Sequence, residues 1–340
     1  MTARFLLVSA AALAAIAVVP TTASAAGGTT AAARAGSILY LKAGKLWVAS
    51  PDGRVRRRIR HGGRFLNPSQ ADNGTIVAQR GIYLHRLNRR GRQLNRPITT
   101  PFRTNPILPA FNGPFWPEVS PDGTRIAYTY SFVASHFDWA CGCYVTSPSL
   151  NTSYTPANRF EESPEVFRFY SNASWVDNRS VLGTAQHLFD YGGNVLNSVA
   201  VDPLGGGDDS YRTWFSECNP CDDLVTLQLQ RVDEGEMTRQ RDKLVFVAGA
   251  LGGELDGSRL LIYRMQGMPP AFPTGPCQVT GPNGKFTSPT WSPDGRSLAW
   301  QDSRGIWVGR VGDVSGRTCQ LTRRLLVPGG SQPDWGPARP

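Results

Sequence analysis

The sequence predicts an all-β protein in which residues 37–337 form a six-bladed β-propeller. One observation behind this prediction is a turn motif, Ser-Pro-Asp-Gly, which occurs at 292–295 and again at 120–123. Proline presets φ at the first central position, aspartate can bond its own backbone, and glycine accepts the positive φ that closes a hairpin. The other observation is a spacing of about 40 residues between similar groups of short strands, which is typical of propeller blades.

The clearest of these groups lies at 285–313, where short runs rich in β-branched and aromatic residues alternate with turn residues. Its runs at 297–300 and 306–308 have the pattern of strands joined by hairpins. Parts of this group recur elsewhere. Arg-Ile-Ala-Tyr at 125–128 follows the other Ser-Pro-Asp-Gly, and Cys-Gln-Val-Thr at 277–280 returns 42 residues later as Cys-Gln-Leu-Thr.

The repeat resembles that of the TolB-like β-propellers, a WD-like family in which a tryptophan is followed by Ser-Pro-Asp-Gly. The match is strict at 291–295 and good at 119–123, and looser matches extend over nearly all of the chain after residue 37. The resemblance implies that each copy marks the hairpin between the two inner strands of a blade. It implies a fold more than it implies a function.

The first blade lacks an inner strand at its beginning, and the far end of the chain supplies one. Pro333 and Trp335 stand in the same spacing as Pro289 and Trp291. We therefore expect the C-terminal strand to pair with the N-terminal blade and close the ring, which removes the exposed edges of an open row of sheets. The expected blades are 330–337 with 37–60, 64–100, 114–160, about 169–215, about 222–280 and 285–325.

The fourth and fifth blades depart most from the motif. In the fourth, Trp-Val-Asp-Asn at 175–178 replaces the usual turn sequence. In the fifth, strands are expected at 224–230, 243–248 and 259–265, and the polar run at 232–242 stands where a turn is expected. Six blades fit the length of the chain, whereas a seventh has no corresponding sequence.

The N-terminus has the features of an export signal over residues 1–25. Arg4 is its only charge, an apolar run covers 5–19, and Ala-Ser-Ala at 23–25 offers a cleavage site. Residues 26–36 are expected to form a flexible leader. The apolar run is too short for a comfortable membrane span, and no later stretch is apolar enough for one. We therefore expect a monomeric protein that is secreted or held outside the cytoplasm in the cell envelope.

Six cysteines in an exported chain favour disulfides over metal or redox chemistry. The cysteines expected to pin loops through disulfides are Cys141, Cys143, Cys218 and Cys221. Four thiolates could instead bind zinc, although Cys-x-Cys is shorter than the usual ligand spacing. Cys277 and Cys319 fall near the outer strands of adjacent blades. The rotation between blades should hold them farther apart than the ~7 Å Cα limit of a disulfide, so a direct bond between them is not expected.

Long irregular segments, among them an insertion at 131–143, are expected to gather on one face of the ring, and loops on a rigid scaffold are where binding residues usually lie. The predicted partner-binding residues are His136, Phe137, Asp138, Trp139, His187, Phe189, Asp190 and Tyr191. Imidazole and carboxylate groups could bind a metal or transfer protons. Their spacing matches no strong ligand motif, so no metal and no cofactor are expected. The alternative is that these polar residues only hold an aromatic-rich loop in place.

Basic residues cluster at 54–60 and 89–92, on or beside the outermost strands of the first two blades. Charged edge strands resist edge-to-edge pairing, which is one interpretation. The other is an anionic partner such as a glycan or cell-wall polymer, which the net charge of +10 favours. Nucleic acid is not expected as the partner of an exported protein.

Catalytic motifs are absent from the sequence. It contains no Gly-x-Ser-x-Gly, no His-Glu-x-x-His and no phosphate-binding glycine loop, and the expected inner strands supply few acids, so no catalytic residue is assigned. Trp116, Trp175, Trp291 and Trp335 are interpreted as packing within the blades. We expect a non-catalytic scaffold that binds a protein or glycan through its loop-rich face. The alternative is an enzyme of the polysaccharide lyase or hydrolase type with a site at the central channel.

Overall fold

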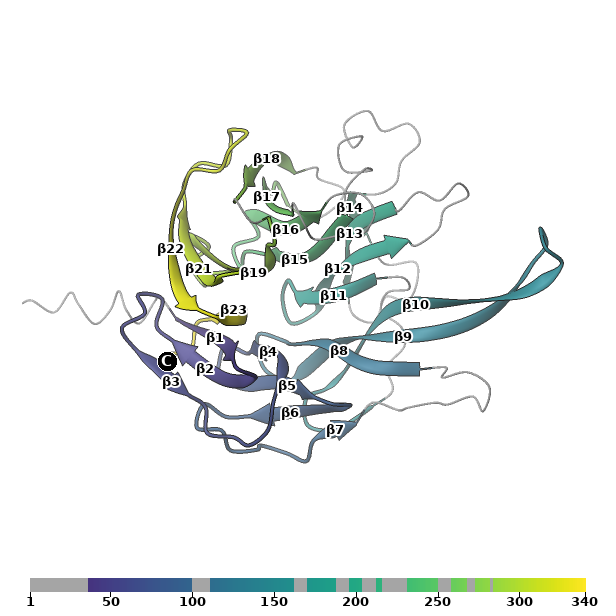
Figure 1. Ribbon diagram of the computed structural model, residues 1–340, viewed down its shortest axis with the longest axis horizontal. Coiled ribbons are helices and arrows are strands. Elements are labelled where there is room, and N and C mark those ends of the chain that lie inside the picture. The colour runs from purple at the N-terminus through teal and green to yellow at the C-terminus, as the bar shows by residue number, and fades with distance from the viewer. Residues whose placement is uncertain are drawn as a thin grey trace, which may run out of the picture.

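The computed structural model describes residues 36–99, 111–161, 170–187, 196–203, 212–215, 231–249, 258–267, 273–281 and 284–340. These residues form β-strands joined by turns and contain no helix (Figure 1). The prediction of an all-β propeller is confirmed. The targeting segment 1–25, the leader up to residue 35 and the expected strand at 224–230 lie outside the described residues. No helix able to cross a bilayer is found in the part of the chain that is described.

The strands form six antiparallel sheets within the described ranges, and we number the sheets in chain order. Sheet 1 contains β23 (Gly330–Gly336), β1 (Ser37–Lys42), β2 (Lys45–Ala49) and β3 (Arg56–Arg58); sheet 2 contains β4 (Leu66–Gln70), β5 (Ile76–Arg80), β6 (Tyr83–Leu87) and β7 (Ile98–Thr99). Sheet 3 contains β8 (Phe111–Val119), β9 (Arg125–Asp138) and β10 (Cys143–Pro156); sheet 4 contains β11 (Tyr170–Trp175), β12 (Ser180–His187), β13 (Leu196–Pro203) and β14 (Arg212–Phe215). Sheet 5 contains β15 (Arg231–Met237), β16 (Lys243–Gly249), β17 (Arg259–Arg264) and β18 (Thr274–Val279); sheet 6 contains β19 (Thr287–Trp291), β20 (Ser297–Asp302), β21 (Gly305–Val311) and β22 (Leu321–Pro328).

The repeated turn motif forms the same hydrogen-bonded turn wherever it occurs. At 292–295 the Gly295 amide donates to the Ser292 carbonyl over 2.8 Å, and the Ser292 hydroxyl donates to Asp294 over 2.6 Å. The copy at 120–123 repeats both bonds, at 2.8 and 2.7 Å. A third copy, Ser-Pro-Asp-Gly at 50–53, joins β2 to β3. The tetrapeptide therefore specifies a tight hairpin, and it is used between outer strands as well as inner ones.

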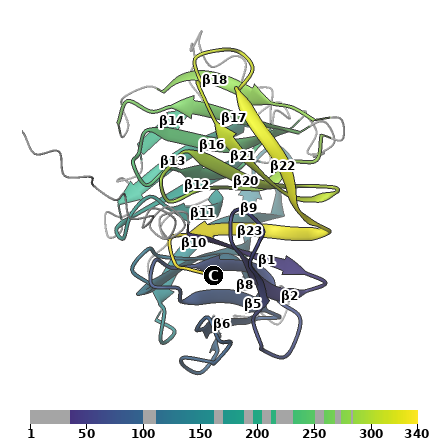
Figure 2. The ribbon, with the colours of Figure 1, turned by 90° about the vertical axis from the view of Figure 1, so that its left-hand side faces the viewer.

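The two ends of the chain meet in sheet 1. Strand β23 pairs with β1, with Trp335 opposite Ile38, so the predicted pairing of these two segments is present. Figure 2 shows the yellow β23 beside the purple β1. The Ser37 hydroxyl also donates to the Ala338 carbonyl over 2.6 Å. The innermost strand of sheet 1 therefore comes from the last residues of the chain.

The hydrophobic core lies between consecutive sheets. Trp335 of sheet 1, for example, packs with Ala299 and Val327 of sheet 6, and Leu39 of sheet 1 packs with Ile76 of sheet 2. Similar clusters join sheets 2 and 3, sheets 4 and 5, and sheets 5 and 6. Full burial of one large apolar side chain contributes about 1.5–3 kcal/mol. Each interface between sheets is therefore a core of its own.

Two expectations about the strands are corrected. The inner strand of sheet 5 is β15, within the polar run where a turn was expected, because this strand turns its glutamates away from the core. The expected insertion at 131–143 is not an irregular loop. It is a continuation of β9, which pairs residue by residue with β10 from Arg125 opposite Pro156 to Asp138 opposite Cys143.

The prediction that Cys277 and Cys319 would not bond is wrong. They form a disulfide with a Cα separation of 4.8 Å. The segment before Cys319 leaves sheet 6 and lies along β18 of sheet 5, where the Gln278 amide donates to Arg317 and the Cys319 amide donates to Gln278. The connection that crosses from sheet 6 to sheet 5 therefore brings the two cysteines together despite the rotation between blades.

Candidate functional site

The longest strands that the structure describes form a ribbon that projects from sheet 3. Strands β9 and β10 each have 14 residues, whereas most other strands have five to eight. We call residues 131–150 the ribbon, and Figure 1 shows it extending well beyond the other sheets. Beyond Phe132, the last residue of β9 that pairs with β8, the two strands of the ribbon pair only with each other, so each keeps one edge whose main-chain groups face away from its partner.

Three aromatic side chains form a cluster at the tip of the ribbon. The Phe137 ring lies 4.9 Å from that of Trp139 and 5.4 Å from that of Tyr144, in edge-to-face geometry. Trp139 is 89% exposed and Tyr144 is 77% exposed. Aromatic groups of this size normally bury most of their surface, so this exposed cluster is a candidate interaction site.

A disulfide between Cys141 and Cys143 closes the tip, with a Cα separation of 5.2 Å. It lies in the turn between the two strands, directly beside the aromatic cluster. The expectation that these cysteines pin their loop through a disulfide agrees with this bond. Cys218 and Cys221 lie outside the described residues, as do Phe189, Asp190 and Tyr191.

The histidines of the predicted partner-binding set are placed by their backbones. His136 pairs with Val145 in the ribbon, and Asp138 pairs with Cys143 at its end. His187 ends β12 in sheet 4, opposite Leu196. Both histidines therefore lie within the second strand of neighbouring sheets and not in loops. Within the described residues no group of three or more possible metal ligands comes together.

The inner strands of the six sheets border a shared cavity, which we call the channel. Each contains one non-glycine residue in the left-handed region, with φ between 43° and 52°: Asn67, Trp116, Asn172, Glu234, Ser288 and Gln332. Side-chain-bearing residues adopt this conformation rarely, so its recurrence shows that all six strands bend in the same way. All six residues line one cavity of about 140 Å³. Trp116 is 36% exposed here, so its expected role in blade packing is not what the structure shows.

Each inner strand carries a carboxylate or a hydroxyl two residues after its left-handed residue, and the two kinds of group alternate from sheet to sheet. In order around the six sheets the residues are Asp334, Ser69, Glu118, Ser174, Glu236 and Thr290. The three carboxylates border both the first cavity and a second one of about 250 Å³ on the side of the Ser-Pro-Asp-Gly turns. They therefore form the narrow part of the channel.

These side chains also link one sheet to the next. The Glu236 carboxylate accepts the Trp291 amide over 2.9 Å, and Thr290 accepts the Trp335 amide over 3.0 Å. Asp334 in turn accepts the Gln70 amide. The same kind of bond joins Ser69 to the amide of β8 at Val119, over 3.0 Å. A repeated position thus holds the inner strands together as well as lining the channel.

Burial shifts the ionisation of the channel carboxyls towards neutral pH. Loss of solvation raises the pKa of Glu236 to about 8, although the bond from the Trp291 amide opposes it. It likewise raises the pKa of Asp334 to about 7 against the opposing bond from Gln70. The pKa of Glu118 is raised well above its usual value, first by burial and then by the charges of Asp334 and Glu236. Carboxyls that titrate near neutrality can give or accept protons, which is why such groups are candidates for chemistry.

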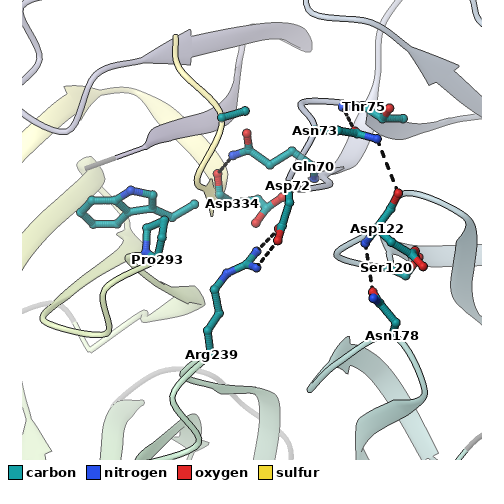
Figure 3. Close-up of polar contacts among 12 residues, drawn as sticks. Gln70, Asp72, Asn73, Thr75, Ser120, Asp122, Asn178, Arg239, Pro293 and Asp334 are labelled. Atoms are coloured by element: carbon teal, nitrogen blue, oxygen red, sulfur yellow. Dashed lines mark hydrogen bonds and ion pairs between the residues drawn. The ribbon is translucent and has the colours of Figure 1, made fainter. Parts of the chain in front are cut away.

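An ion pair spans the mouth of the channel on the side of the turns. Arg239 from sheet 5 contacts Asp72 from sheet 2 through two pairs of guanidinium nitrogen and carboxylate oxygen (Figure 3). Sheets 2 and 5 are three positions apart in the chain order of the six sheets. Neighbouring turns are joined as well, for example by the Asp122 amide, which donates to Asn178 over 3.0 Å. The mouth on this side is therefore partly covered by the protein's own charged groups.

The channel carboxylates were not predicted from the sequence. Few acids were expected on the inner strands, and Glu236 falls in the run where a turn was expected. An alignment of the six inner strands on the residue before Pro68, Pro117, Pro289 and Pro333 would have revealed the alternation. The alternation is visible in the sequence only when residues 231–237 are taken as the inner strand of sheet 5.

Comparison with known proteins bears on the fold. No protein-family model matches the chain, and no curated protein matches it in sequence. Among solved structures, TolB from Acinetobacter baumannii is similar with a TM-score of 0.51 and 16% identity, over 89% of this chain and 67% of that one. The chain has a TolB-like β-propeller fold.

Two further solved structures resemble this TolB-like fold less closely. A putative TolB from Agrobacterium tumefaciens has a TM-score of 0.34 and 15% identity, over 76% of this chain and 95% of that chain. A prolyl endopeptidase has a TM-score of 0.42 and 15% identity over 76% of this chain, which spans only 35% of the peptidase. At this level of identity the likeness concerns the fold alone.

Proposed function

We propose that the six sheets are the blades of one closed ring formed by residues 37–337. Each inner strand contacts the next around the ring, including β19 with β23 and β23 with β4. The six left-handed residues and the shared cavity support the same arrangement. A closed ring makes a rigid base, and such a base can hold a projecting ribbon in a fixed direction.

The protein acts outside the cytoplasm, after removal of residues 1–25. The apolar N-terminal run with its Ala-Ser-Ala site supports export, and two disulfides among the described residues suit an oxidising compartment. Expression of the full chain with a C-terminal tag, followed by N-terminal sequencing of the extracytoplasmic fraction, should give a chain that begins at Ala26. A full-length product retained in the cytoplasm would contradict this.

The ring is a non-catalytic scaffold that presents the ribbon tip to a protein or glycan partner. The observation that carries this is the exposure of Trp139 and Tyr144 beside Phe137, at the end of the longest described strands. Tryptophan and tyrosine are enriched where binding energy concentrates, because they bury a large area with few rotatable bonds. The disulfide at Cys141 and Cys143 limits the freedom of the tip and so lowers the entropic cost of binding.

The test compares binding by three forms of the mature protein. Trp139→Ala with Tyr144→Ala removes the exposed aromatics, and Tyr83→Ala with Leu66→Ala is the matched control, because those side chains are exposed on sheet 2. A protein captured from the native cell envelope by the parent and the control, but at least tenfold less by the ribbon variant, is the expected result. A glycan array read with the same three forms distinguishes a sugar from a protein. Equal binding by all three forms would remove the ribbon as the site.

A second candidate function is supported by the channel carboxyls. Glu118, Glu236 and Asp334 meet at the narrow part of the channel with raised pKa values, which suits a lyase or hydrolase that acts on a polysaccharide. Release of reducing ends from acidic polysaccharides would be measured for the parent and for Glu236→Gln. Turnover that the substitution abolishes would favour the enzyme over the scaffold.

A further inference from the structure

The net positive charge of the protein is concentrated in one segment of the chain. Residues 36–99 contain fourteen arginines and lysines and two aspartates, a net charge of +12. Residues 100–340 contain twenty basic and twenty-four acidic residues, a net charge of −4. The overall charge of +10 therefore hides a strongly basic segment on an otherwise slightly acidic protein.

This basic segment forms sheet 2 and all of sheet 1 except β23, and these sheets are neighbours in the ring. Nine of its arginines are exposed: Arg54, Arg56, Arg58, Arg60, Arg64, Arg80, Arg90, Arg92 and Arg96. We call these nine residues the arginine surface. Twelve of the fourteen basic residues are arginine, the side chain whose planar fork matches the oxygens of phosphate.

The two basic runs, about 30 residues apart in the chain, meet in the folded protein. Arg57 turns towards sheet 2 and donates to the Arg89 carbonyl over 2.7 Å, and the His61 ring bonds the Gly91 carbonyl over 2.9 Å. A Cβ on Gly91 would lie 2.4 Å from the Arg60 carbonyl, so only glycine allows this approach. The contact places Arg90 and Arg92 beside the flank of β3.

Few acidic groups neutralise this surface. Within the described part of the chain, Arg54 has an ion pair with Asp52, at 3.6 Å, and the remaining aspartate of the segment, Asp72, pairs with Arg239. Protection of an edge strand would explain charges on β3. It does not explain Arg90 and Arg92, which lie in a turn.

The charges also have a regular arrangement. Arg56 and Arg58 occupy alternate positions of β3, where side chains on one side of a strand are about 6.6 Å apart, and Arg54 and Arg60 continue the alternation in the sequence on either side. A row of forks at this spacing suits an extended chain of anionic groups better than a flat surface. We propose that the arginine surface binds a linear polymer with regularly spaced phosphate groups, outside the cytoplasm. This site is separate from the ribbon, so either one can be wrong without the other.

The test uses the intact mature protein and long-chain inorganic polyphosphate as the probe. Arg58, Arg60, Arg90 and Arg92 are changed together to Gln, because all four side chains are exposed. The dissociation constant measured by titration calorimetry should rise at least 50-fold. The slope of log K against log salt should become shallower by about 3, given a slope of ~0.7 per phosphate contact on a single-stranded chain.

The matched control removes the same charge elsewhere. Arg179, Arg296, Arg310 and Arg317 are exposed on sheets 4 and 6 or their connections, and their joint change to Gln should alter affinity less than threefold. Equal losses in both variants would show that net charge alone drives binding and would overturn the proposal. So would a parent protein that fails to bind polyphosphate, or that binds phosphatidylglycerol vesicles in its place. Thermal unfolding of each variant confirms that the fold is retained.

Discussion

Two junctions of the propeller are held in different ways. In sheet 1, the ends of the chain are joined without a covalent bond, because Trp335 pairs with Ile38 and both lie in one apolar cluster. Between sheets 5 and 6, Cys277 and Cys319 add a covalent link across 42 residues of chain. The junction between the two ends of the chain thus has no covalent bond, whereas the junction between sheets 5 and 6 has one.

In the free energy of folding, the extra cost of closing the longer loop is no larger than the gain from burying one large side chain. Closing a loop of about 300 residues costs only about 1.7 kcal/mol more than closing one of 42, because the entropy grows with the logarithm of length. Burial of one large aromatic side chain such as Trp335 contributes about 1.5–3 kcal/mol. Packing of a single inner strand can therefore offset the additional loss of chain entropy.

The largest expected effect is on the noncovalent junction. Deletion of residues 330–340 removes β23, so sheet 1 loses its inner strand and Thr290 loses its bond from the Trp335 amide. We expect loss of the cooperative thermal transition in calorimetry, since the lost burial is comparable with the whole stability of a domain. Deletion of 339–340 alone keeps β23 and the bond to Ala338 and is the control. A normal transition without β23 would contradict this account of the junction.

The covalent junction should be the next most sensitive. Cys277→Ala with Cys319→Ala should lower the free energy of unfolding by about 3–4 kcal/mol, from the entropy of a 42-residue loop. The measurement is urea denaturation followed by circular dichroism. Cys141→Ala with Cys143→Ala removes a bond between residues two apart in the ribbon and should have a much smaller effect. Equal effects would mean that loop length does not determine the contribution.

Both junctions contain a buried carboxyl whose ionisation can be used to compare them. The pKa of Glu236 is about 8, above its usual 4.5, so its stabilising contribution is complete below about pH 4.5 and is lost as the pH rises through 8. The free energy of unfolding should fall between pH 5 and 9, and Glu236→Gln should remove on the order of 3 kcal/mol of that fall.

The same experiment applies to the noncovalent junction. The pKa of Asp334 is about 7, so Asp334→Asn should remove a fall centred about one pH unit lower. Glu161→Gln is the control, because that carboxylate is exposed and paired with Arg159. An unchanged pH dependence in both channel variants would mean that these groups ionise normally.

The smallest effect is expected for the ion pair across the channel mouth. Arg239 and Asp72 are both more than a third exposed, so their interaction should contribute only about 0.5 kcal/mol. A double-mutant cycle with Arg239→Gln and Asp72→Asn, in low and high salt, measures it. A coupling above 2 kcal/mol would show that this contact, and not the junctions between sheets, holds the ring together.

The sequence by itself determined the local part of this structure. Turn chemistry at 120–123 and 292–295, and the spacing of Pro333 and Trp335, were enough to predict the inner hairpins and the pairing of the two chain ends. The turns depend on few residues in a row, and the pairing of the chain ends was predicted because the motif repeats, so both are visible in the chain. Phe137 and Trp139 were also predicted to bind a partner, which stays a prediction, whereas Tyr144 was not in the predicted set.

The tertiary structure decided what depends on residues far apart. It brought Cys319 to Cys277 through a crossing connection, joined the two arginine runs at Gly91, and placed three carboxylates at one level of the channel. Such contacts depend on how each sheet is rotated and set against the next. That arrangement is specified by packing between sheets and not by any short run of sequence.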